Sequence, residues 1–174
     1  MFKDTLSTIL SKLVPAHKNK NKTLLVAQYV LDKVKTTSRP SVTPMKLMKL
    51  VYIAHGYMLG QHGKPLLEEN IMAWEHGPSI KHLYRNVRKY RSQPVDKLID
   101  ADFNLLTADE KQTIDLVIDI YNKHSAVDLS KAMHGVGTPW NTTWYITESN
   151  QPISNDLIEY FYKDVVKSKI IQSL

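Results

Sequence analysis

Seven histidines are the residues of this chain best suited to acid–base or metal chemistry. A helical zinc site typically places two histidines one turn apart with a glutamate beside them, as in the pattern H-E-x-x-H. His55 and His62 could share a helix face, and His76 and His82 flank a Gly-Pro pair, but no carboxylate lies at ligand spacing beside either pair. We therefore expect no metal site and no cofactor.

Nucleophilic and nucleotide chemistry have little support in the residue pattern. The chain has no cysteine, and Ser79 lacks the glycine-flanked turn that exposes the nucleophile of a serine hydrolase. Neither a G-x-G-x-x-G run nor a Walker lysine motif occurs. Two of the three glutamates Glu68, Glu69 and Glu75 could supply an acid–base pair only if one of them were desolvated. Solvated surface charges are the simpler interpretation. We predict that the protein is not an enzyme.

Clustered basic residues offer another chemistry, the binding of anions. Residues 81–97 carry six basic residues and one acidic residue, or +5, whereas residues 100–128 carry seven acidic and two basic residues, or −5. The basic segment could meet phosphates, an acidic partner or the acidic stretch of the same chain. Because no helix-turn-helix or other reader motif accompanies it, we expect nucleic-acid binding to be weak or absent.

The elements that must position these residues are predicted to be mainly helical. Apolar residues recur at the spacing of a single helix face in several segments, and capping residues mark some of their ends. The predicted helices span residues 2–14, 24–34, 44–59, 78–91, 107–121, 125–134 and 154–172. Two short strands, at residues 66–67 and 71–74, predict one small hairpin, and residues 135–140 are expected to form a loop.

The helix that starts after Thr43 and Pro44 is expected to be central and buried. Threonine caps free backbone donors and proline prefers the first helical position, and the residues that follow leave almost no polar face. Gly56 and Gly60 lie one turn apart on this helix. Their missing side chains predict close packing against another backbone rather than a ligand site.

The composition is that of one small domain outside the membrane. Of 174 residues, 43% are hydrophobic and the net charge is +6, so the chain can bury a core and carries a moderate basic excess. No apolar stretch is long enough to span a membrane, and the start of the chain does not resemble a signal peptide. We expect a cytoplasmic protein in which a mainly α domain, residues 23–174, follows an amphipathic helix and basic linker, residues 1–22.

The order of short motifs along residues 45–84 resembles the Panacea domain, also called SocA-like, which is often found in phage and mobile-element proteins. The first motif combines a Lys-Leu-x-Lys-Leu helix start with an Ala-Trp-x-His-Gly-Pro turn, and the second is a Leu-Ser helix that ends in His before a Pro-Trp pair. The resemblance covers roughly residues 24–165. The motif residues, interpreted as structural or binding residues, are Lys46, Leu47, Lys49, Leu50, Tyr52, Gly56, Trp74, His76, Gly77, Pro78, His134, Pro139 and Trp140.

The chain departs from the family pattern at a few positions. Glutamine is common in the family where this chain has Met48 and His55, and a hydrophobic residue commonly follows the Gly-Pro pair where this chain has Ser79. Any polar role that the family assigns to these positions is therefore not transferred. The first 22 residues lie outside the resemblance.

The resemblance implies an antitoxin that neutralises a cognate toxin by direct protein contact, with presentation of the toxin to an ATP-dependent protease as a further role. The alternatives are a DNA-binding autoregulator and, last, a hydrolase that uses His55, His76 or His134. The sequence leaves open whether the protein forms a homo-oligomer. Arginine and tyrosine dominate interface hot spots, so we predict the following toxin-binding residues on the basic helix: Tyr84, Arg85, Arg88, Tyr90 and Arg91. Large aromatic residues are usually buried, and we expect Trp74 and Trp140 to serve packing.

Overall fold

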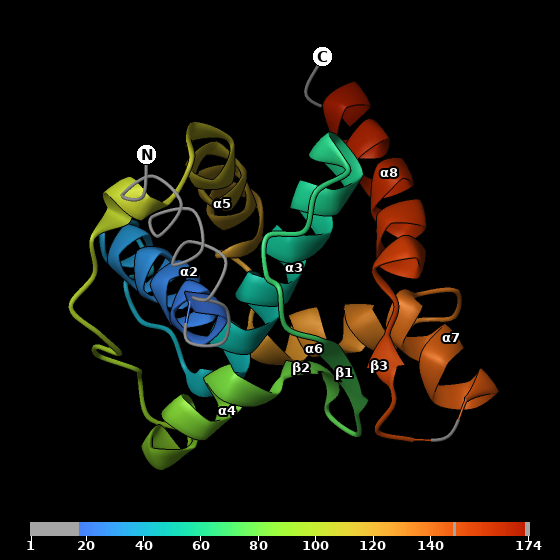
Figure 1. The fold of residues 1–174 in the computed structure, drawn as a ribbon, viewed down its shortest axis with the longest axis horizontal. Helices are drawn as coiled ribbons and strands as arrows, with labels where there is room; N and C mark the ends of the chain where they lie inside the picture. Colours follow the sequence, from blue (N-terminus) through green and yellow to red (C-terminus); the bar gives the residue numbers. More distant parts are fainter. Residues whose placement is uncertain (1–17, 148, 173–174) are drawn as a thin grey trace, which may run out of the picture.

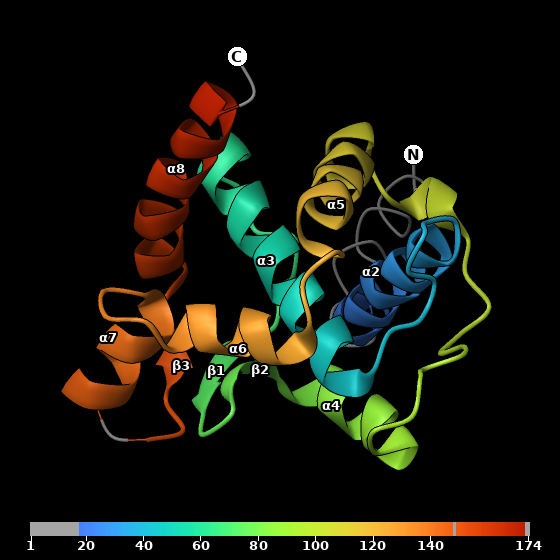
Figure 2. The same cartoon turned by 180° about the vertical axis from the view of Figure 1, so that it is seen from behind.

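A computed structural model describes residues 18–147 and 149–172 of the chain, and it confirms a mainly helical fold (Figures 1 and 2). The helices are α2 (Lys18–Lys35), α3 (Pro44–His62), α4 (Lys81–Val87), α5 (Ala108–Tyr121), α6 (Ala126–His134), α7 (Pro139–Ile146) and α8 (Asn155–Gln172), with short 3-10 helices at Arg88–Tyr90 and Phe103–Leu105. The strands are β1 (Ile71–Trp74), β2 (Gly77–Ile80) and β3 (Pro152–Ile153). Within these ranges no helix is long and apolar enough to cross a membrane.

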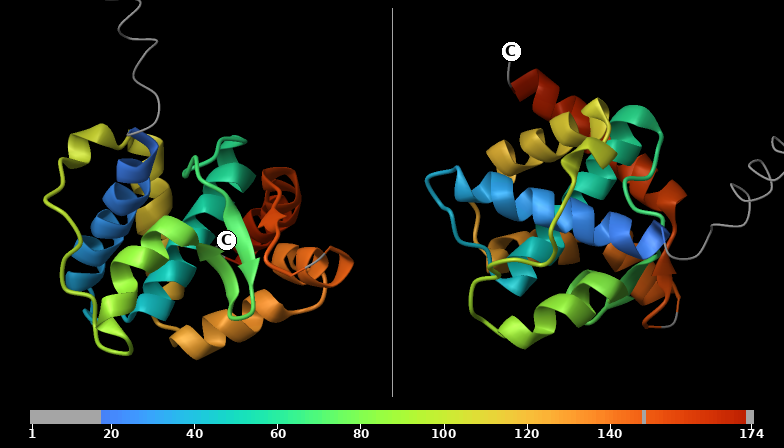
Figure 3. Two further views of the ribbon diagram at one scale, coloured as in Figure 1. Left: turned by 60° about the horizontal axis from the view of Figure 1, so that its bottom comes forward. Right: turned by 60° about the vertical axis from the view of Figure 1, so that its left-hand side comes forward.

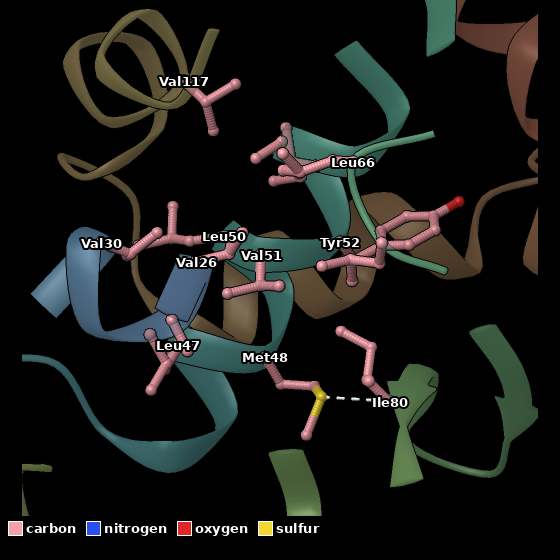
Figure 4. Packing of buried hydrophobic residues seen from close by; sticks show 14 of the residues in the cluster. Val26, Val30, Leu47, Met48, Leu50, Val51, Tyr52, Leu66, Ile80 and Val117 are labelled. Carbon is pink, nitrogen blue, oxygen red and sulfur yellow. Dashed lines mark hydrogen bonds between the residues drawn. The ribbon is translucent and has the colours of Figure 1, made fainter. Parts of the chain in front are cut away.

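Helix α3 is the centre of the molecule, as the near absence of a polar face predicted. Thr43 caps its first turn by accepting from the Lys46 backbone N–H, Pro44 occupies the first helical position, and Gly63 ends the helix with φ 62°. Every residue from 46 to 59 is buried. Figure 4 shows side chains of this helix beside Val26 and Val30 of α2 and Ile80 of β2, and Val117 of α5 belongs to the same core. The remaining elements therefore form a shell around one helix.

That shell has two sides and a base (Figure 1). Helices α2 and α5 cover one flank of α3, α8 covers the other, and α6, α7 and the small sheet lie across the end where α3 begins. The view from behind shows α6 crossing that end of α3 (Figure 2). Capping boxes formed by Thr107 with Glu110 and by Ser125 with Asp128 are both present, so local hydrogen bonding starts α5 and α6 where the sequence indicated.

The contact between α3 and α8 depends on the two glycines of α3. A Cβ added to Gly56 would lie 2.3 Å from the Tyr162 ring, and one added to Gly60 would lie 2.8 Å from the backbone carbonyl of Tyr162. Tyr162 also packs edge-on against Tyr52 and Tyr57 of α3. The prediction that these glycines serve close packing is therefore confirmed.

The predicted hairpin was placed wrongly in the chain. Residues 71–74 do form a strand, but β1 pairs with β2, Gly77–Ile80, through a turn at residues 75–76, and not with residues 66–67. The Leu67 backbone N–H donates instead to Nδ1 of His55, so it is unavailable to a strand partner. The strand order β2-β1-β3 makes β2 an edge strand, where Pro78 is tolerated.

Three other segments differ from the sequence-based expectation. Helix α4 begins at Lys81 rather than at Pro78, because residues 77–80 are used by the edge strand, and it ends at Val87, where the 3-10 helix Arg88–Tyr90 takes over the rest of the predicted helix. Pro139 opens helix α7 rather than ending a loop, with Thr138 as its cap. Helix α2 begins at Lys18, inside the expected linker, and Lys22 on it forms an ion pair with Glu110 of α5 at 2.7 Å. The helix predicted over residues 2–14 lies outside the described residues.

Replacing Gly60 by alanine tests the close approach of α3 and α8. In an unconstrained helix this change stabilises by roughly 0.5–1 kcal/mol. Here the added methyl group meets backbone atoms of α8 that cannot rotate away, so we expect Gly60→Ala to lower the free energy of unfolding by about 1–3 kcal/mol. Urea unfolding measures the effect, and a gain in stability would contradict the packing described above.

Candidate functional site

A hollow of about 450 Å³ lies where the start of α3, the β1–β2 hairpin and α4 meet. The left panel of Figure 3 shows the hairpin and α4 in front of α3. Three motif residues, Lys49, Trp74 and His76, line this hollow together with three of the predicted toxin-binding residues, Tyr84, Arg88 and Arg91. The rest of the lining comes from Pro44, Met45, Met48, Glu75, Ser79, Val87 and Asn150. The fold thus brings the first family motif and the basic helix to one place.

Lys49 attaches helix α3 to the hairpin turn. Its side chain is buried, with 2% of the residue exposed, and Nζ donates to the carbonyl oxygens of His76 at 2.8 Å and Pro78 at 3.1 Å. Burial lowers the pKa of Lys49 to about 8, and no carboxylate in the described part of the chain pairs with it. A buried amino group that, within the described residues, is held by carbonyl dipoles is thereby placed in the lining of the hollow.

The second motif binds the same turn. Nε2 of His134, at the end of α6, lies 3.2 Å from the Glu75 carbonyl oxygen, while its Nδ1 lies 2.6 Å from the Ser130 carbonyl oxygen. Nε1 of Trp140 donates to the Trp74 carbonyl oxygen at 2.7 Å. The two motifs, far apart in the sequence, therefore converge on the backbone of one hairpin.

Gly77 is the residue that makes this convergence possible. Its φ is 101°, in a region that residues with a side chain rarely adopt. An added Cβ would lie 2.7 Å from Nζ of Lys49 and 3.2 Å from Cε1 of His134. The role of Gly77 and Pro78 is therefore structural, because they set the shape of the hairpin turn.

The two motif tryptophans differ in environment. Trp140 is buried, lies against the His134 ring at 4.0 Å and stacks on Trp144 at 5.2 Å, so it packs as expected. Trp74 is half-buried and meets the Tyr84 ring edge-on at 5.3 Å, in the wall of the hollow. Trp74 therefore combines packing with a surface that a partner can reach.

The other motif residues lie away from the hollow and serve the core. Lys46 is buried, burial lowers its pKa, and its Nζ donates to the Asn122 carbonyl oxygen beyond the end of α5 at 2.6 Å. The remaining members, all buried, are Leu47, Leu50, Tyr52, Gly56 and Pro139.

The histidines named for a hydrolase have separate structural environments. His55 is fully buried, accepts from the Leu67 N–H, and contacts Oδ1 of Asn155 through Nε2, and burial lowers its pKa to about 4. His76 is exposed at the rim of the hollow, and His134 binds the turn. Across residues 18–147 and 149–172, no three histidine, aspartate or glutamate side chains are grouped to hold a metal ion.

The predicted toxin-binding residues divide into two groups. Tyr84, which is 45% exposed, faces the hollow with Arg88 and Arg91, whereas Arg85 is exposed but does not line it. Tyr90 is half-buried, and its hydroxyl donates to the Lys97 carbonyl oxygen at 2.9 Å. Sequence reasoning missed Met45, although it lies on the same helix face as Met48 and Lys49 by its spacing of three and four residues.

The acidic stretch of the chain does not neutralise the basic helix. Three of its carboxylates face α2 and α3: Glu110 pairs with Lys22, Asp115 pairs with Lys33 at 3.0 Å, and Asp109 lies 3.9 Å from His62. Asp100 pairs with Lys97, which belongs to the basic segment but lies outside α4. In the part of the chain that the structure describes, none of the three arginines of residues 85–91 forms an ion pair. Their charges are therefore available to a partner.

Comparison with known proteins agrees with the motifs that meet at the hairpin. Residues 47–141 match the family described as "Antitoxin SocA-like, Panacea domain". The chain is 30% identical over 126 residues to Antitoxin SocA of Caulobacter vibrioides (strain NA1000 / CB15N), a match that covers 67% of this chain and 66% of that protein, slightly under two thirds of its length. No solved structure matches the chain. The chain belongs to the SocA-like antitoxin family defined by the Panacea domain.

Replacing Lys49 by methionine tests the buried charge. The folded-state pKa of about 8 lies below the ordinary 10.5, so between these values the unfolded chain binds more protons at this residue and the contribution of Lys49 to stability rises with pH. We expect the free energy of unfolding of the parent, measured relative to Lys49→Met at the same pH, to rise by about 2 kcal/mol from pH 8 to pH 10. Urea unfolding at three pH values measures it. The exposed Lys81→Met is the control, and an unchanged slope in Lys49→Met would contradict the assignment.

Replacing Gly77 by alanine tests the space at the turn, with Gly137→Ala as the matched control. Both glycines have positive φ, but a Cβ at Gly137 meets nothing within 4 Å. Gly137→Ala should therefore cost only the backbone strain, about 1–2 kcal/mol. Because Gly77→Ala also displaces Lys49, we expect it to cost about 1 kcal/mol more. If Gly77→Ala and Gly137→Ala lost the same amount of stability, the side chains around the turn would not restrict the space at residue 77.

Proposed function

We propose that this protein is an antitoxin that neutralises its cognate toxin by direct protein–protein binding at the hollow beside α4, and that it is not an enzyme. The observation that carries the proposal is the pairing of an apolar hollow with two arginines, Arg88 and Arg91, that have no ion-pair partner in the described ranges. Action in the cytoplasm is part of this proposal.

The size and chemistry of the site suit a protein partner. A stable interface buries about 1,600 Å² in total, and a few tyrosine, tryptophan and arginine side chains supply most of the binding free energy. Tyr84, Trp74 and Arg88 are such residues, and they are held on a hairpin and a helix fixed against α3. A toxin whose active site is covered by this surface would be inhibited without any chemical step, and a complex held in this way could also be presented to an ATP-dependent protease.

Charge reversal at two arginines close in sequence tests the proposal, since one lines the hollow and the other does not. We expect Arg88→Glu, at the start of the 3-10 helix Arg88–Tyr90, to weaken binding of the cognate toxin more than tenfold, about 1.4 kcal/mol, because Arg88 lines the hollow. Arg85→Glu, three residues earlier in α4, changes the charge by the same amount and should have a smaller effect. Binding is measured with the toxic product of a gene adjacent to this one, and rescue of growth is scored in cells that express both proteins.

Two results would contradict this surface. Loss of binding together with a fall in the circular-dichroism signal of the helices would mean that Arg88 supports the fold. If deletion of residues 1–20 abolished neutralisation while both arginine variants behaved like the parent, specificity would reside in the N-terminal extension.

A DNA-binding autoregulator is the second candidate, favoured by the same unpaired arginines. Phosphate attraction by a few basic residues falls steeply with salt concentration and carries no sequence information. A sequence-specific complex with the DNA upstream of the gene that stays tight at physiological salt would place this function above the antitoxin role.

A further inference from the structure

The hollow has a distinct chemical division between its floor and its rim. The apolar part of its lining comes mainly from Met45, Met48, Trp74, Tyr84 and Val87. Met45 is 44% exposed, although methionine is a residue that cores usually bury. Flexible thioether side chains adapt to the shape of an inserted group, so this floor suits a large apolar side chain.

The charged residues of the lining carry an excess of positive charge. The exposed Arg88 and Arg91 form what we call the rim, Lys49 is buried, and Glu75 is the acidic residue of the lining, so the formal balance is three positive charges minus one, or +2. None of the three cations forms an ion pair in the described part of the chain. An occupant that brings carboxylates would therefore gain charge-assisted hydrogen bonds, preferably with the planar guanidinium groups.

We propose that the hollow binds a protein segment in which one large apolar side chain is flanked by carboxylates, with the apolar group on the methionine floor and the carboxylates on Arg88 and Arg91. This inference rests on the proposed function, because it assigns the segment to the toxin. The site selects its partner by combining the two features, since neither an apolar side chain alone nor an acidic stretch alone would use both the floor and the rim.

Other occupants fit these observations less well. The first 17 residues of this chain contain an apolar stripe, but their charged residues are Lys3, Asp4 and Lys12, so the segment brings one carboxylate and additional positive charge. A single-stranded nucleic acid would stack its bases on exposed aromatic faces, whereas Trp74 and Tyr84 already meet each other edge to face. A duplex would contact the arginines through its phosphates and make no use of the apolar lining. A partner segment that is acidic and apolar is complementary in both respects.

Synthetic peptides added to the full-length protein test the proposal. The probe is the capped peptide Asp-Glu-Phe-Leu-Asp-Glu, compared with one that has lysine for every acidic residue and one that has serine for both apolar residues. The methyl groups of methionine, labelled with ¹³C, report the location. We expect the first peptide to shift the signals of Met45 and Met48 while those of Met58 and Met133 stay in place, and to bind at least tenfold more tightly than either control peptide.

Variants of Arg88 and Arg85 complete the test. Arg88→Glu should weaken binding of the acidic peptide at least tenfold, and Arg85→Glu should change the affinity for this peptide less than threefold. The proposal is overturned if the lysine peptide binds equally well, if Met58 or Met133 responds instead, if no peptide binds at millimolar concentration, or if a single-stranded oligonucleotide shifts Met45 and Met48 at lower concentration than the acidic peptide.

The two proposals can fail separately. Suppose that the Arg88→Glu variant still neutralises the toxin of the adjacent gene and that the acidic peptide causes no response. The hollow would then be excluded as the binding site, and the antitoxin role would stay intact. A peptide response at Met45 and Met48 in a protein that neutralises no such toxin would retain the hollow as an acidic-segment site and remove the proposed function.

Discussion

The carbonyl oxygens of the β1–β2 hairpin must find donors, and the packing of the whole lower end of the molecule depends on how they do so. Lys49 of α3 donates to the carbonyls of His76 and Pro78, and Trp140 of α7 donates to that of Trp74. Because a buried carbonyl without a donor costs about as much as a lost hydrogen bond, α3 and α7 must both lie against the hairpin. Helix α4 follows directly from β2, so the same contacts fix the position of the hollow and of the arginines beside it.

The distribution of charge has a similar origin in packing. The −5 of residues 100–128 and the +5 of residues 81–97 suggested mutual neutralisation, yet α5 lies beside α2, and its acidic residues pair there, Glu110 with Lys22 and Asp115 with Lys33. In Figure 1 helix α5 lies above α2 and helix α4 lies below it, and the pair formed by Asp100 and Lys97 lies outside α4. The chain thus uses its negative charge to join two helices and leaves its positive charge at the hollow, which is the physical basis for proposing an acidic partner.

Local signals explain which elements could be predicted. Thr43 with Pro44, and the capping boxes at Thr107 and Ser125, satisfy backbone donors within one turn of the chain, so their helices begin where the sequence indicates. Thr138 carries the same signal before Pro139, but α7 was not expected because the Pro-Trp pair was assigned to a loop. The hairpin was misplaced for a different reason, because strand pairing is decided by which backbone donors are free, and the distant imidazole of His55 takes the N–H of Leu67.

The sequence by itself determined the fold class, the central helix, the tight packing of its glycines and membership of an antitoxin family, since periodicity, capping residues and short motifs are all local properties of the chain. It also pointed to Tyr84 and the arginines of the basic helix. Tertiary structure alone decided that Arg88 faces the hollow and Arg85 does not, that Met45 belongs to the site, and that Lys49 is a buried cation held by carbonyl groups. These features depend on which distant segments lie together, and that is settled by burial and hydrogen-bond satisfaction over the whole domain rather than by neighbouring residues.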